Sequence, residues 1–119
     1  MIFSKEHVWL EVKDDIAEVG LSQFKKNKMG KVVFVDMPEE DDSIRKGDVL
    51  FSVEFAKSQS EFESPITGMV VECNEDILDE PDILNDDCEG NYILKIKLDN
   101  PEEIDELLSV EEYSEFCKH

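Results

Sequence analysis

The chain has 119 residues, of which 31 are acidic and 12 are basic, and its formal net charge is −19 at pH 7. A chain of this length buries about two thirds of its unfolded surface, so we expect one domain with a hydrophobic core, spanning residues 1–119. So negative a protein repels phosphate backbones and anionic lipid headgroups, which excludes nucleic acid and membrane surfaces as partners.

The N-terminal residues and the cysteines indicate a cytoplasmic protein. Residues 1–6 have no basic stretch followed by an apolar one, and no later window approaches about 18 consecutive apolar residues. Cys73, Cys88 and Cys117 contain no CxxC spacing, and only His7 and His119 are available as nitrogen ligands. We therefore expect reduced thiols and no metal site.

Short segments rich in β-branched and aromatic residues predict seven strands. They are residues 8–10, 16–19, 32–35, 49–55, 60–63, 69–73 and 92–98. In the fourth of these segments apolar residues occupy every second position, which predicts one fully buried face. Those residues are Val49, Phe51, Val53 and Phe55.

Three short helices are expected between and after the strands. Ser22 is a suitable N-cap for a helix that runs to Lys28 and ends at Gly30. A second helix is expected after Asn100, with proline at its first position, and Ser109 begins a third as a capping box. The last two are expected to pack across an end of the sheets. Many short strands with few helices predict a small sandwich or flattened barrel.

Lys57 occupies an unusual place, in the turn between two predicted strands. Residues 47–94 contain thirteen acidic side chains, and Lys57 is the only basic residue in this segment. Neighbouring carboxylates favour the ammonium form, so a lysine nucleophile is not expected, and no GxSxG, HExxH or GxxxxGK[ST] motif is present. We therefore predict a protein that is not an enzyme. From these residues alone, Lys57 is either an ordinary surface lysine or the attachment point of an acyl group.

Several segments point to one family by their order and spacing. They are HVWL (7–10), VGLSQF (19–24), GKVVFVDMP (30–38), GD (47–48), VEFAK (53–57), SPITG (64–68), VVECNE (70–75) and LLSVEEY (107–113). The chain resembles the H proteins of the glycine cleavage system over most of its length. This resemblance implies a mostly β fold, the lipoyl/biotinyl-type flattened barrel-sandwich of two small antiparallel sheets with short flanking helices, including C-terminal helices.

The resemblance also implies a function in glycine catabolism and one-carbon metabolism. Lys57 matches the family's lipoyllysine, so lipoate is the expected covalent cofactor. The implied partners are glycine decarboxylase (P protein), aminomethyltransferase (T protein), dihydrolipoyl dehydrogenase (L protein) and a lipoyl ligase or transferase. The carrier moves the aminomethyl intermediate between these enzymes on the lipoyl arm.

Five further residues are site candidates. Glu54, Glu61 and Glu63 lie near Lys57 in sequence, and we expect them to be recognised by partner enzymes through salt-sensitive steering. If the arm docks on its own protein, Phe55 and Phe62 are expected to line the groove. Solubilising glutamates remain an equal explanation for the three acids.

Alternative functions remain open at this stage. The family usually has a small residue and then valine before the lysine, where this chain has Phe55 and Ala56. A divergent H-like carrier, acting as a lipoyl donor or in a redox response, is therefore the main alternative. A biotin carrier, a lipoyl domain of a 2-oxoacid dehydrogenase and an acidic binding module with an unmodified lysine are the others.

Overall fold

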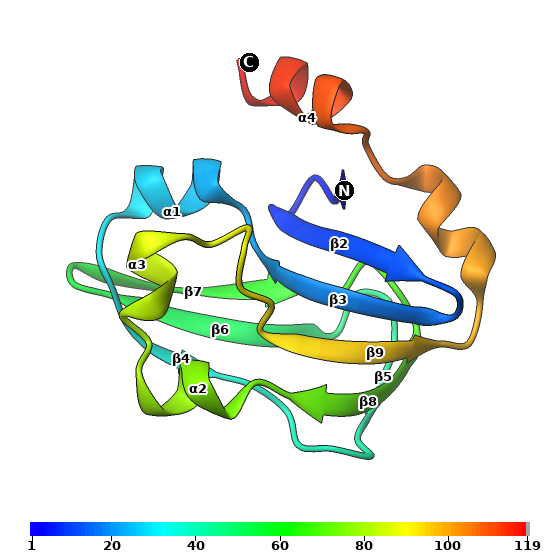
Figure 1. The fold of residues 1–119 in the computed structure, drawn as a ribbon. Helices are drawn as coiled ribbons and strands as arrows, with labels where there is room; N and C mark the ends of the chain where they lie inside the picture. Colours follow the sequence, from blue (N-terminus) through cyan, green and yellow to red (C-terminus); the bar gives the residue numbers. More distant parts are fainter. Residues whose placement is uncertain (119) are drawn as a thin grey trace.

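The computed structural model describes residues 1–118 and arranges nine strands in two antiparallel sheets (Figure 1). The six-stranded sheet has the order β1-β2-β3-β9-β8-β5, and the three-stranded sheet has the order β4-β6-β7. The first contains β1 (Ile2–Phe3), β2 (Val8–Lys13), β3 (Ile16–Leu21), β5 (Ser43–Ile44), β8 (Gly68–Cys73) and β9 (Leu94–Leu98). The second contains β4 (Val32–Asp36), β6 (Val49–Phe55) and β7 (Ser58–Glu63).

The predicted fold of two antiparallel sheets with short helices is confirmed, and within residues 1–118 neither sheet closes on itself. Each of the seven predicted strands is present. The two-residue strands β1 and β5 were not predicted, because two residues carry no alternating pattern. β9 starts at Leu94 rather than at Tyr92.

The helices are α1 (Gln23–Met29), α2 (Glu75–Asp79), α3 (Ile83–Asp86), the 3₁₀ helix η1 (Pro101–Glu106) and α4 (Val110–Cys117). The Ser22 cap, the Gly30 stop and the Ser109 capping box are confirmed, with Gly30 at φ 98°. α2 and α3 were not predicted, since each has only one buried residue. None of the helices in residues 1–118 has the length and apolar character needed to cross a bilayer.

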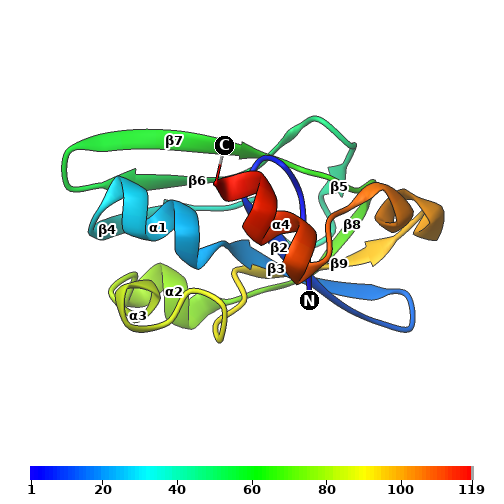
Figure 2. The same ribbon diagram turned by 90° about the horizontal axis from the view of Figure 1, so that it is seen from above.

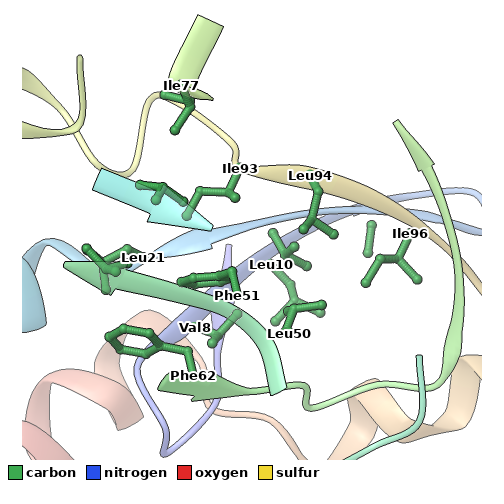
Figure 3. Packing of buried hydrophobic residues seen from close by; sticks show 14 of the residues in the cluster. Val8, Leu10, Leu21, Leu50, Phe51, Phe62, Ile77, Ile93, Leu94 and Ile96 are labelled. Carbon is green, nitrogen blue, oxygen red and sulfur yellow. The ribbon is translucent and has the colours of Figure 1, made fainter. Parts of the chain in front are cut away.

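The core fills the space between the two sheets. Figure 3 shows Phe51 and Phe62 of the smaller sheet pointing toward Val8, Leu10 and other aliphatic residues of the larger sheet. A second, aromatic cluster of Phe3, Trp9 and Tyr113 joins α4 to the N-terminal strands. The Phe3 and Tyr113 rings stack with centroids 4.2 Å apart. This contact gives the predicted packing of the last helix against the sheets.

The alternation predicted for β6 holds only over its second part. The register with β7 shifts between Val49 and Phe51, which is a β-bulge at Leu50. Leu50 and Phe51 are therefore both buried, while Val49 is 48% exposed. From Phe51 onward the apolar side chains face the core as expected, and Val53 is fully buried.

Candidate functional site

Lys57 lies at the tip of the hairpin formed by β6 and β7. The two strands pair as far as Phe55 and Ser58, so Ala56 and Lys57 alone make the turn. The Lys57 side chain is exposed. This turn is the leftmost point of the ribbon in both Figure 1 and Figure 2, so its end is open to an approaching partner.

The turn is held in place from two sides. Ala56 N–H donates a hydrogen bond of 2.8 Å to the Lys31 carbonyl, at the start of β4. The side chains of Phe55 and Val32, which lie opposite each other on β6 and β4, are buried beneath it. Because a backbone hydrogen bond and the core both support the hairpin end, the Lys57 side chain extends from an anchored point of the backbone.

The backbone of this turn differs from the commonest two-residue hairpins. In the described chain, the residues other than glycine with positive φ are His7, Asp14 and Asp41. Ala56 and Lys57 therefore do not form a type I′ turn, which needs positive φ at both residues, or a type II′ turn, which needs it at the first. The pairing of Ala56 with Lys31 offers an alternative source of support for the hairpin end.

A shallow hollow of about 390 Å³ adjoins Lys57. It is lined by Asn27, Lys28, Met29, Gly30, Lys31, Ala56 and Lys57. The sequence placed Lys57 among carboxylates, whereas the fold places two further lysines beside it. This difference arises because the chain leaves α1 at Gly30 and enters β4, and β4 pairs with β6 next to the turn.

Glu54, Glu61 and Glu63 lie on the outer face of the three-stranded sheet. All three are exposed, and in the described residues none of them takes part in an ion pair. Glu54 lies opposite Gln59 across β6 and β7, and Glu61 lies opposite Ser52. The structure thus brings the three acids together on one surface that ends at the Lys57 turn.

Phe55 and Phe62 do not line a groove, which corrects the expectation from sequence. Each is only 2% exposed and belongs to the main core. Phe62 stacks on Phe51 with ring centroids 5.1 Å apart. Both lie on the inner face of their strands, and a side chain buried between the sheets has no surface to offer the arm.

His7, Tyr113 and Ser22 form a hydrogen-bonded network. It resembles the networks of catalytic sites, but here it connects elements of the fold. His7 Nδ1 is 2.6 Å from the Tyr113 hydroxyl, which is 2.8 Å from Ser22 Oγ. Ser22 is fully buried, and its Oγ also accepts a hydrogen bond from the Lys25 N–H as the N-cap of α1. His7 itself lies in the turn before β2 rather than within the strand. This network of hydrogen bonds therefore links α1 and α4 to the turn before β2.

The described residues offer no metal site, and their cysteines are free thiols. Among residues 1–118, no three His, Cys, Asp or Glu side chains lie close enough to hold a metal ion, and His119 lies outside the described residues. Cys73, Cys88 and Cys117 are free thiols. Burial raises the pKa of the Cys88 thiol to about 12 and also raises the pKa of Cys73.

Sequence reasoning missed Lys28 and Lys31 in the hollow beside Lys57, and Phe34 and Asp36 on the outer face of the three-stranded sheet. Phe34 lies directly opposite Glu54, and Asp36 lies opposite Ser52. The places of Phe34 and Asp36 on that face depend on which strand pairs with β4 and in which register. A repeating pattern along one strand does not contain that information.

The whole chain is similar to known glycine cleavage H proteins. The family model for the glycine cleavage H-protein matches residues 1–119. A glycine cleavage system H protein from Alkaliphilus oremlandii is 42% identical over 118 residues, covering 99% of this chain and 93% of its own. One from Staphylococcus epidermidis is 40% identical over 114 residues, covering 95% and 90%.

A solved structure shows the same fold. The crystal structure of a glycine cleavage system H protein from Mycobacterium marinum superposes with a TM-score of 0.90 at 24% sequence identity. The match covers 99% of this chain and 96% of that protein.

Proposed function

The chain belongs to the glycine cleavage H-protein family, the lipoyl carriers of the glycine cleavage system, and from this premise we propose that Lys57 is the residue that carries the lipoyl group. We also propose that residues 1–119 act as one carrier domain that catalyses no step itself. The observation that supports the assignment of Lys57 is its place as an exposed lysine on an anchored two-residue turn.

The geometry suits covalent attachment through an amide. The exposed amine is accessible to a modifying enzyme, while the Ala56–Lys31 hydrogen bond keeps the backbone beneath it fixed. When attached, the lipoyl group supplies a dithiolane that accepts an amine-bearing one-carbon unit and releases it to a second enzyme. With bonds of about 1.5 Å, roughly ten of them place that ring on the order of 10 Å from the turn.

The family works with the P, T and L proteins of glycine cleavage. For this chain we assign these roles to glycine decarboxylase, aminomethyltransferase and dihydrolipoyl dehydrogenase, with a lipoyl ligase or transferase to attach the arm. Glu54, Glu61 and Glu63 are assigned to recognition of basic partner surfaces. Exposed charges suit this task, because they steer association without a large apolar interface and so permit rapid release.

Lipoylation of purified apo-protein tests the assignment of Lys57. A lipoyl ligase with lipoate and ATP should add one lipoyl group, which intact mass and peptide mapping should locate at Lys57. Lys57→Arg keeps the positive charge but cannot form the amide, so this variant should gain no mass. Lys31→Arg, in the same hollow, is the matched control and should be lipoylated like the wild type. Lipoate on another residue, or on none, would contradict the proposal.

Charge reversal tests the recognition role separately. Glu61→Lys with Glu63→Lys should slow lipoylation while leaving the fold intact, since both side chains are exposed and unpaired in the described structure. An unchanged lipoylation rate would leave these glutamates with a solubilising role only.

The divergent H-like carrier was suggested by Phe55 and Ala56, two departures next to the lysine. Phe55 faces the core, so of these two residues Ala56 alone contributes to the surface that a partner meets. We therefore favour the glycine cleavage role. Exchange of the glycine carboxyl group with carbon dioxide, measured with glycine decarboxylase and the lipoylated protein, separates the two, and an absence of exchange would favour the divergent carrier.

A further inference from the structure

The outer face of the three-stranded sheet has an exposed aromatic residue among acids. Pairing sets three rows across this face, Phe34–Glu54–Gln59, Asp36–Ser52–Glu61 and Val49–Glu63. The alternate residues Val35, Val53 and Phe62 point to the core. Every residue in the three rows therefore belongs to one surface.

Phe34 is the unusual member of this surface. It is 47% exposed, whereas Phe3, Phe51, Phe55 and Phe62 are almost completely buried. Val33, its neighbour in the chain, is 43% exposed, and Val49, in the third row of the same face, is 48% exposed. An exposed aromatic ring with acidic neighbours has the composition of an interface, where an apolar anchor lies inside a polar rim.

The acids around Phe34 are available to a partner. In the described chain, Asp36 and the three glutamates form no ion pair with any of its basic side chains. A hollow of about 250 Å³, lined in part by Asp36, Pro38, Ser52 and Glu61, opens beside them. The complementary surface is therefore basic and includes an apolar pocket for an aromatic ring.

We propose that this face docks the enzyme that acylates Lys57, with Phe34 as the anchor residue. The inference rests on the proposed function. That enzyme has to reach the lysine nitrogen itself, so its surface must approach the turn closely. Gln59, the β7 member of the Phe34 row, lies two residues from Lys57, or about 7 Å along the strand, and Phe34 lies on β4 at the other end of the same row. Enzymes that act on the loaded arm meet its far end, on the order of 10 Å from the turn, and need less contact here.

Charge also distinguishes the two sides of the hairpin. The hollow beside Lys57 contains Lys28 and Lys31, while the outer face carries Asp36, Glu54 and Glu61. A basic enzyme surface is repelled by the first and attracted by the second. This difference orients the enzyme so that it approaches Lys57 from the outer face.

Lipoylation kinetics of Phe34→Ala test the inference. With a lipoyl ligase, lipoate and ATP, we expect the KM for the apo-protein to rise about tenfold with kcat unchanged, as for loss of an interface anchor. Phe34→Leu should recover part of the loss. Val71→Ala, which shortens a side chain that is 40% exposed on β8 of the other sheet, is the matched control and should behave like the wild type. Circular dichroism checks that each variant is folded.

The outcomes separate the two proposals. A KM for Phe34→Ala within twofold of the wild type, with lipoate still added at Lys57, would overturn the docking face and leave the function of Lys57 standing. Failure of the wild type to accept lipoate at Lys57 would overturn both. After full lipoylation, Phe34→Ala should support normal glycine–carbon dioxide exchange. A defect confined to that exchange would assign the face to another partner and contradict the inference.

Discussion

The side-chain amide of Asn85 pairs with the backbone of Val32 as a neighbouring strand would. The Val32 N–H donates to Asn85 Oδ1 at 2.8 Å, and Asn85 Nδ2 donates to the Val32 carbonyl at 3.0 Å. Val32 lies in β4, an edge strand, opposite Phe55. Asn85 therefore completes the sheet edge close to the hairpin end that carries Lys57.

Replacing Asn85 should destabilise the protein. Asn85→Ala leaves both Val32 backbone groups without their partner, so we expect a loss of about 1–3 kcal/mol in the free energy of unfolding. Urea denaturation measures it. Asn91→Ala removes an exposed hydrogen bond to the Asp87 carbonyl and serves as control, with an expected change within about 0.5 kcal/mol. Equal stabilities of the two variants would show that the Val32 contact contributes nothing.

Gly68 should not tolerate a larger side chain. A Cβ atom at this position would lie 2.0 Å from the Lys97 carbonyl oxygen and 2.7 Å from a methyl carbon of Ile96. Gly68→Ala forces β8 away from β9, so we expect a loss of about 1–3 kcal/mol, and more if the strands separate. Thermal unfolding tests this, with Val71→Ala on the same strand as a control that should cost less than about 1 kcal/mol. A Gly68→Ala variant as stable as the wild type would contradict the close approach.

The stability of the protein should fall in mild acid partly through His7. Burial lowers the pKa of His7 below its ordinary value of 6.5, and Lys25 and Lys28 lower it further. Below pH 6.5 the unfolded chain binds a proton that the native protein resists. The stability contributed by neutral His7 is thus lost as the pH falls from 6.5 through the native pKa, with a slope of at most about 1.4 kcal/mol per pH unit.

His7→Asn tests this dependence. Asparagine does not titrate, and it tolerates the positive φ of 70° at this position. The variant loses the contact with Tyr113 at every pH, so its stability should be lower but should vary less between pH 7 and pH 5. Urea denaturation at pH 7, 6 and 5 gives the comparison. Parallel curves for the two proteins would assign the acid sensitivity to other groups.

Cys88 should be almost unreactive in the native protein. Burial raises the pKa of its thiol from 9.0 to about 12, so the thiolate fraction at pH 8 falls roughly a thousandfold. Alkylation with iodoacetamide, followed by peptide mapping, should label Cys88 only after denaturation. Cys117, which is partly exposed, is an internal comparison. Labelling of native Cys88 as fast as in urea would contradict its burial. A protonated thiol also does not compete in disulfide exchange with a dithiol arm.

The sequence predicts the strands well where they are long, because alternation and β-branched residues report one buried face. It fails at Leu50, where a bulge reverses the alternation, and at α2, whose acidic segment has one buried residue, Ile77. The place of Lys57 in a turn is confirmed. Its surroundings were predicted only in part, because the pairing of β4 with β6 also brings Lys28 and Lys31 to the hollow beside it.

The same dependence on strand pairing explains which site residues could be predicted from the sequence and which could not. Glu54, Glu61 and Glu63 are near Lys57 along the chain, and sequence suffices to find them. Phe34 is 23 positions away, and its row with Glu54 depends on a register that also contains a bulge between Val32 and Phe34. Phe55 and Phe62 were expected to line a groove because they are apolar and close to the lysine. Side chains alternate between the two faces of a strand, and this alternation places both residues in the core.

The hydrogen bond between Ala56 and Lys31 also makes the hairpin end a suitable reference point for distance measurements. Since it holds the hairpin end still relative to the rest of the molecule, a spin label attached at position 57 would have a well-defined origin. Spectroscopic distances from that label to a second label on a bound enzyme would then triangulate the orientation of the complex, with little blurring from backbone motion.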